Sequence, residues 1–477
     1  MSRGPNPIAR GWMRLGPRFL PFADAATTEL PLGRLLRLSL FQISVGMAVV
    51  MLSGTLNRVM IVELNVDAWL VALMVALPVA FAPLRVLIGY RSDHHKSRLG
   101  WRRVPYIWMG SLLQFGGFAI MPFALLLLSG DTHGPAFVGP LSAAAAFLLV
   151  GVGLHTTQTA GLALATDLAP AHARPRVVAL LYVMLLVGMM ISSLIFGALL
   201  SDFSQLRLIQ VIQAAALITI CLNMVALWKQ EVRDPARTSP DRVRPPLREL
   251  WRDVTAESSV RRLLLAVALG TAAFSMQDIL LEPYGGQVLG LSVSATTLLT
   301  ALLAGGALAG FAVAARGSKR GGDPCRTAGF GVVIGIVAFS AVILAGPFGS
   351  VLLFQIGTIL IGLGSGMFSV GTLIAAMAIA DRRHAGLVVG AWGAAQATAA
   401  GVAIAFGGAF RDIVGAIASA GGIGPALQHS STGYAASYLL EIILLLVTLV
   451  VIGPLARHTN QMSENRSWRL GLAELPS

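Results

Sequence analysis

Charged residues are scarce in this sequence, and their scarcity excludes an ordinary soluble globular fold. Asp, Glu, Lys and Arg make up 12% of the 477 residues, hydrophobic residues make up 56%, and 52 residues are glycine. The apolar share of soluble proteins, glycine included, is about 45–50%. With a mean hydropathy of +0.76, the chain is predicted to cross a membrane many times.

Other absences narrow the function. The two cysteines, Cys221 in an apolar run and Cys325 in a basic loop, give neither a disulfide framework nor a metal-binding spacing. There is no phosphate loop of the type GxxxxGK followed by Ser or Thr, and no Ser, His and Asp arrangement. The N-terminus has scattered arginines and lacks the short apolar core of a cleavable signal peptide. We therefore expect neither an enzyme nor an ATP-driven pump.

Long apolar runs dominate the chain instead. Twelve runs reach the roughly 20 residues that a helix needs to cross a bilayer, and the lack of water in the bilayer core requires each to be helical. Lys and Arg gather in alternate loops, and only Arg207 and Arg411 fall near the opposite face. This asymmetry predicts that both termini are cytoplasmic. It also accounts for the net charge of +13 without nucleic acid as a partner.

The runs form two predicted halves. The stretch KQEVRDPARTSPDRVRPPLRELWRDV has the Pro, Arg and Asp density of a linker and separates six runs from six. Asp167 and Asp381 end the fourth and tenth runs in similar sequences, which indicates an internal repeat. We predict an all-α polytopic membrane protein with twelve transmembrane helices in two six-helix pseudo-repeats, as in the major facilitator superfamily. The predicted parts are residues 1–33 (cytoplasmic arm), 34–228 (first bundle), 229–259 (cytoplasmic linker), 260–456 (second bundle) and 457–477 (cytoplasmic tail).

The N-terminal arm contains an amphipathic segment, IARGWMRLGPRFLPF. Its apolar residues recur at helical spacing, and Arg10, Arg14 and Arg18 form a second stripe. Such a segment can lie in the cytoplasmic membrane interface with its arginines among anionic lipid headgroups. Docking on a partner protein is the alternative.

The loop after the second run, GYRSDHHKSRLGWRR, resembles the signature of the major facilitator superfamily. Gly89 would permit close helix approach, Asp93 would cap a helix or accept hydrogen bonds, and Arg102 and Arg103 would anchor at the anionic cytoplasmic surface. The matching place in the second half lacks an aspartate directly after its glycine. An ordinary basic loop is the alternative.

Ionisable residues inside the apolar runs are few, and each costs roughly 2.5 to 3.5 kcal/mol on insertion scales. Arg58 in the first run and Asp278 in the seventh lie at similar predicted depth. Because these runs flank the central axis of the predicted fold, we expect an Arg58–Asp278 ion pair between the halves, with Glu282 one turn further on the same face. Alternatively, the two carboxylates carry protons for a coupled transporter. The predicted polar site also contains Asn57, Glu63 and Gln277.

Proline and glycine mark expected irregularities and contacts. Pro283, with Gly285 and Gly286 behind it, is expected to end or kink the seventh helix. Small-residue spacings elsewhere let helices approach closely, which concerns packing and not ligand binding. These spacings involve Gly305, Gly306, Gly310, Gly362 and Gly366.

His155, in VGVGLHTTQTAGLALAT, is the one histidine near the middle of an apolar run. A neutral imidazole can ligate the magnesium of a chlorin, and the neighbouring glycines would leave room for a flat macrocycle. The simpler interpretation, which the sequence favours, is a histidine hydrogen-bonded within the bundle beside Thr156, Thr157 and Gln158.

Two stretches carry a more specific resemblance. TLNRVMIVEL at residues 55–64 and MQDILLEPYGG at residues 276–286 resemble the PucC and LhaA family, the light-harvesting complex assembly factors of purple phototrophic bacteria, also called the bacteriochlorophyll delivery family. The likeness covers roughly residues 30–456. The N-terminal arm leans toward the LhaA branch, which serves the core antenna around the reaction centre, while the PucC branch serves the peripheral antenna.

The resemblance implies a function, pigments and partners. It implies assistance with the insertion of antenna polypeptides and delivery of bacteriochlorophyll a, with carotenoid as a further pigment, in the intracytoplasmic photosynthetic inner membrane. The implied partners are the light-harvesting α and β polypeptides, reaction centre or core antenna intermediates, bacteriochlorophyll synthase, the protein translocation machinery and membrane lipids. The alternative is a secondary transporter of an amphiphilic tetrapyrrole or other small solute, which could be proton-coupled.

Overall fold

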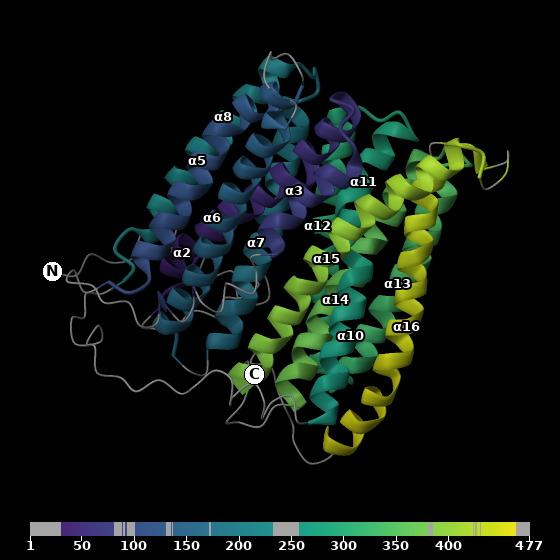
Figure 1. Cartoon of the computed structure of the whole chain (residues 1–477). Helices are drawn as coiled ribbons and strands as arrows, with labels where there is room; N and C mark the ends of the chain where they lie inside the picture. Colours follow the sequence, from purple (N-terminus) through teal and green to yellow (C-terminus); the bar gives the residue numbers. More distant parts are fainter. Residues whose placement is uncertain are drawn as a thin grey trace.

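The computed structural model describes most of the apolar part of the chain. All regular secondary structure in the described part is helical (Figure 1). The described residues are 30–80, 88, 91–92, 101–129, 135, 137–170, 173–231, 257–379, 385–422, 424, 427–429 and 431–463. The predicted arm segment, most of the predicted linker, the end of the predicted tail and the predicted roles of Gly89 and Asp93 lie outside these residues.

Twelve helical rods in the described residues confirm the predicted all-α fold. Eleven of them are long and apolar enough to cross a membrane, and the described part of α3 is shorter. Two rods are each built of consecutive pieces: the first of α2 (Leu32–Val49), η2 (Val50–Leu56) and η3 (Val59–Glu63), the seventh of α10 (Ser258–Ser275) and α11 (Gln277–Gln287). The others are α3 (Ala68–Ala80), α5 (Val104–Leu128), α6 (Val138–Leu168), α7 (Arg174–Leu199), α8 (Gln205–Leu227), α12 (Val293–Lys319), α13 (Pro324–Ala345), α14 (Val351–Ile379), α15 (Ala385–Ser419) and α16 (Thr432–Ser463).

Local signals set several helix starts. The hydroxyl of Ser204 accepts a hydrogen bond from the backbone N–H of Arg207 at 3.2 Å and so caps α8. Asp323 caps α13 in the same way, through the N–H of Cys325 at 2.8 Å. Short polar side chains at these positions satisfy backbone donors that have no partner within the helix. The apolar runs between such caps then propagate as helices.

The two halves lie side by side and meet along several helix pairs (Figure 1). Among these pairs, α3 packs on α15, α7 packs on α12, and η2 packs on α11 and α12. Gly408 of α15 makes the first contact tight, because a Cβ there would lie 2.7 Å from the backbone oxygen of Ala68. The backbone N–H of Trp69 also donates to the Asp412 carboxylate at 2.7 Å. The start of α3 is thereby fixed to the second half.

The buried apolar residues show where the halves separate. One large hydrophobic core contains residues of both halves. A second, smaller core lies wholly in the first half, among α2, α5, α6, α7 and α8, and includes Leu35 and Val177 near the helix ends that are predicted to be cytoplasmic. The halves therefore share their core toward the outer side and have separate packing toward the predicted cytoplasmic side.

Candidate functional site

The seventh rod is irregular at a different point from the one predicted. The boundary between α10 and α11 falls at Met276, whereas Pro283 lies inside α11, which continues to Gln287. The helix therefore does not end at Pro283 but one residue after Gly286, while the alternative of a kink at Pro283 stays a prediction. A proline removes the N–H that the carbonyl four residues earlier would accept, so the carbonyl of Ile279 needs another donor.

Asn57 supplies that donor from the other half of the protein. Its side chain is fully buried, and its Nδ2 atom donates to the Ile279 carbonyl at 3.2 Å, with a second, longer contact to the Asp278 carbonyl at 3.4 Å. Nδ2 also donates to the Ser53 carbonyl of its own helix at 3.0 Å. Membrane helices tolerate proline where a neighbouring helix satisfies the freed backbone group. Asn57 and Pro283 therefore act as a complementary pair across the interface.

The predicted Arg58–Asp278 ion pair is wrong. The Arg58 guanidinium pairs with Glu63, one turn further along its own rod, and its Nη2 atom donates to the Leu291 carbonyl at 3.2 Å. Arg58 is 4% exposed, whereas Glu63 is partly exposed to solvent. A local partner with access to solvent costs less desolvation than a second deeply buried charge. Both Asn57 and Arg58 therefore make polar contacts across the interface, but with backbone carbonyls and not with the Asp278 carboxylate.

Two glycines make room for the charged side chains at this interface. A Cβ on Gly54 would lie 2.6 Å from the Glu282 carboxylate, and a Cβ on Gly286 would lie 3.3 Å from the Arg58 guanidinium. The missing side chain of Gly54 thus leaves space for Glu282 of the other half, and that of Gly286 leaves space for Arg58. Glu282 is 3% exposed and accepts a hydrogen bond from the Thr300 hydroxyl.

Two further carboxyl groups, those of Asp278 and Glu441, lie near the start of α11. Glu441 of α16 is fully buried and lies close to Asp278 and the backbone of Gln277. The Gln277 side-chain amide donates to Asp278. Within the described residues neither carboxyl group forms an ion pair, and Glu441 has no side-chain hydrogen-bond partner. The position of Glu441 could not be predicted, because the sequence does not indicate which rod faces it.

The pairing of Asn57 with Pro283 predicts a rescue. Asn57→Leu removes the donor for the Ile279 carbonyl, and an unsatisfied buried carbonyl costs about 1–3 kcal/mol. Adding Pro283→Ala returns an intrahelical N–H to that carbonyl, so the double variant is expected to regain most of the loss. Thermal unfolding of the purified variants measures both effects. Equal unfolding temperatures for Asn57→Leu with and without Pro283→Ala would contradict the pairing.

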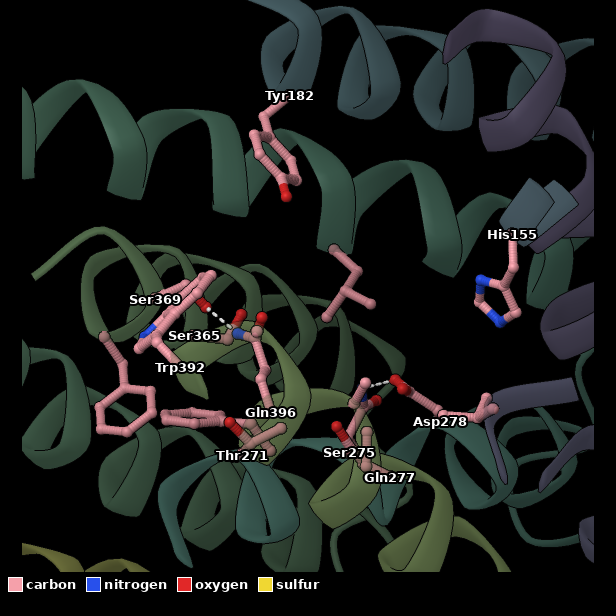
Figure 2. A pocket seen from close by; sticks show the side chains of 17 residues that line it. His155, Tyr182, Thr271, Ser275, Gln277, Asp278, Ser365, Ser369, Trp392 and Gln396 are labelled. Atoms are coloured by element: carbon pink, nitrogen blue, oxygen red, sulfur yellow. Dashed lines mark hydrogen bonds between the residues drawn. The ribbon is translucent and has the colours of Figure 1, made fainter. Parts of the chain in front are cut away.

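A cavity of about 370 Å³ lies between the two halves next to this interface. Figure 2 shows Asp278 and His155 on facing sides of it, with the Tyr182 hydroxyl directed into the space. The first half contributes three lining residues and the second half the remainder. The polar and aromatic lining residues are His155, Tyr182, Thr271, Phe274, Ser275, Gln277, Asp278, Ser365, Phe368, Ser369, Trp392 and Gln396.

Most of these lining residues were missed by sequence reasoning, although a signal was present. Polar residues recur four positions apart in three of the apolar runs, as Thr271 and Ser275 do in α10. This spacing places both side chains on one helix face. The same spacing joins Ser365 to Ser369 and Trp392 to Gln396.

The cavity does not fit a chlorin well. The glycines beside His155 leave no space for a macrocycle: a Cβ on Gly151 would lie 2.0 Å from the Pro78 ring, and one on Gly153 would lie 2.6 Å from the backbone of α5. The opposite wall carries hydroxyl, amide and carboxyl groups, which an apolar ring face cannot satisfy. The prediction of a His155–magnesium bond gains no support from this cavity.

Charged residues also organise the predicted cytoplasmic end of the first half. Arg102 and Arg103 bind the Asp167 carboxylate at 3.0 and 3.1 Å. Glu231, just after α8, accepts hydrogen bonds from three successive backbone N–H groups that end at Val104, at 2.7 to 3.1 Å, and so caps α5. Arg103 is 4% exposed. The predicted anchoring in lipid headgroups is therefore wrong for Arg103, whose charge is held inside the protein.

Comparison with known proteins gives consistent relatives. A family model described as PUCC protein matches residues 55–460. The chain is 57% identical to protein PucC of Rhodovulum sulfidophilum, over 84% of this chain and 89% of that protein. It is 55% identical to an uncharacterised protein in the puhA-bchM intergenic region of Rhodobacter capsulatus, over 96% of this chain and 97% of that protein. It is also 30% identical to a bacteriochlorophyll synthase 44.5 kDa chain of that species, over 79% of this chain and 85% of that protein.

Solved structures show a similar fold. A bacterial homologue of the human lysosomal transporter Spinster, in an inward-facing and unoccupied conformation, has a TM-score of 0.68 at 15% sequence identity, over 90% of this chain and 97% of that chain. The nucleoside transporter NupG has a TM-score of 0.62 at 13% identity, over 88% and 99% of the two chains. At such low identity the likeness establishes the fold of the major facilitator superfamily alone.

Proposed function

The chain belongs to the PucC family, and from this premise we propose that it assists the assembly of a bacterial light-harvesting complex. A multi-pass membrane protein with a role in the light-harvesting system is what its relatives indicate. Family membership over residues 55–460 is the observation that carries the proposal. The proposed client is the core antenna around the reaction centre, and the peripheral antenna is the less favoured one.

The proposed action is that of a platform and not of an enzyme. Large apolar side chains such as Phe123, Phe330 and Leu352 are exposed on the surfaces of the helices. Such faces can hold single-span α and β polypeptides by shape and dispersion, since lipid supplies no hydrophobic drive between helices. Bacteriochlorophyll a, with carotenoid, would be handed over at these faces. The proposed setting is the intracytoplasmic photosynthetic inner membrane, with both termini cytoplasmic.

The proposed partners follow from this action. They are the antenna polypeptides, reaction centre or core antenna intermediates, bacteriochlorophyll synthase and the protein translocation machinery, together with membrane lipids. The relative named as a bacteriochlorophyll synthase chain is consistent with a setting close to pigment synthesis.

Transport of a small amphiphilic solute is the second candidate. The observation in its favour is the cavity, whose polar lining comes from both halves, together with a fold shared with transporters. In facilitator folds, solute sites lie near the bilayer midplane between the repeats. An amphiphilic tetrapyrrole was one predicted solute, and the polar wall of the cavity favours a smaller one.

Co-purification distinguishes the two candidates. The tagged chain is purified from a pigmented strain and from one that makes no bacteriochlorophyll, and the absorption spectrum and bound polypeptides are recorded. We expect antenna polypeptides with the protein from both strains and bacteriochlorophyll absorption from the pigmented strain. Colourless preparations without antenna polypeptides from both strains would favour transport.

A further inference from the structure

We propose that the wall of the central cavity formed by α10, α11, α14 and α15 binds a small amphiphilic cation, with Asp278 as its counter-charge. The inference starts from the cavity considered above for transport and is independent of antenna assembly. It concerns binding, so it holds whether the bound molecule is moved across the membrane or retained.

The first support is the missing counter-charge. No Lys or Arg is among the described residues that line the cavity, and Arg58, the cation expected to pair with Asp278, is held by Glu63 and by the Leu291 carbonyl. Among the described residues, the side-chain partner of Asp278 is the neutral amide of Gln277. An unpaired carboxylate at membrane depth is costly. A cationic head group in the cavity offsets that cost.

The second support is two cavity-lining residues of the seventh rod whose side-chain oxygens have no hydrogen-bond partner. Within the described residues, the Thr271 hydroxyl oxygen and the Gln277 carbonyl oxygen have no hydrogen-bond partner, although their residues are 7% and 2% exposed and line the cavity. Buried polar atoms in native proteins are almost always satisfied. Both oxygens are covered by neighbouring protein atoms. Once the two side chains rotate toward the cavity, an elongated ligand with several N–H donors, such as an aromatic amine, would satisfy these oxygens as well as Asp278.

The third support is the aromatic part of the same wall. Phe368 and Trp392 line the cavity with Phe274, and the indole N–H of Trp392 donates to the Thr372 hydroxyl at 3.1 Å, which fixes its ring. Aromatic faces attract cations and flat apolar groups. The volume of about 370 Å³ lies at the lower end of the roughly 300–1,000 Å³ found for small-molecule sites. The expected ligand is compact, with a flat apolar body and a nitrogen cation.

Dye binding to the purified full-length protein tests the inference. Ethidium, a flat aromatic cation with two amino groups, is the probe, and the neutral flat dye Nile red reports apolar binding alone; both are followed by fluorescence. We expect saturable ethidium binding that Asp278→Asn weakens at least about tenfold, the loss of a hydrogen bond to a charged group. Nile red binding is expected to be the same in both proteins.

Matched variants separate the site from general packing. Thr271→Val and Gln277→Met, which remove these two side-chain oxygens, are expected to weaken ethidium binding. Thr358→Val and Gln114→Met alter a buried threonine and a buried glutamine outside the cavity and are expected to leave it unchanged. If Asp278→Asn does not fold, the comparison of Thr271→Val with Thr358→Val decides.

Several outcomes would overturn the inference. One is the absence of saturable ethidium binding to the unaltered protein, as expected if Asp278 binds a proton alone. Another is equal binding by Asp278→Asn, or equal losses in the cavity variants and their controls. The assay contains no antenna component, so its failure leaves the assembly proposal standing.

Discussion

Replacement of Gly306 by alanine is expected to destabilise the second half by about 3 kcal/mol or more, the upper range for an overpacked core. A Cβ on Gly306 would lie 2.1 Å from the backbone oxygen of Ile359 on α14, and one on Gly362 would lie 2.0 Å from the backbone oxygen of Leu303 on α12. The backbones of α12 and α14 are therefore in direct contact at both glycines. Backbone atoms cannot move aside as a flexible side chain can, so the helices must separate.

The adjacent glycine provides the matched control. A Cβ on Gly305 would meet nothing within 4 Å, so Gly305→Ala is expected to leave stability within about 1 kcal/mol of the unaltered protein, in line with the helix propensities of the two residues. Accumulation in membranes and thermal unfolding in detergent measure both variants. Gly306→Ala as stable as Gly305→Ala would contradict the close contact.

This pair illustrates how far sequence could predict the fold. The length and apolarity of the runs were enough to predict twelve helices, because a bilayer fixes the length of a spanning helix. The small-residue spacings predicted close helix contacts. The sequence could not show which of Gly305 and Gly306 faces α14, because that depends on the rotation of α12 about its axis, which the packing of its neighbours sets.

The polar site was predicted in part. Burial cost drew attention to Arg58, Asp278 and Glu282, but depth along a helix does not determine the partner of a charge. The carboxylate partner of Arg58 is Glu63 on its own rod, and the side chain that bridges to the seventh rod is Asn57. Asn57 has this role because Pro283 leaves the Ile279 carbonyl without an intrahelical donor. The two segments are far apart in the sequence, so their contact is evident only in the folded structure.

Under the proposed assembly role, loss of the whole chain is expected to have the largest effect, because the antenna polypeptides themselves offer no substitute for an assembly platform. Deletion of the gene in the organism that encodes it is then expected to reduce the core antenna several-fold while bacteriochlorophyll synthesis continues. Restoring the unaltered gene should restore the antenna. Gly306→Ala should fail to do so, whereas Gly305→Ala should succeed.

The absorption spectrum of membranes from the deletion strain tests the central claim most directly. Assembly by this chain predicts that the near-infrared absorption of the core antenna falls several-fold relative to the reaction centre and returns on complementation. Core antenna absorption that matches the parent strain, with antenna polypeptides inserted at normal levels, would contradict the claim.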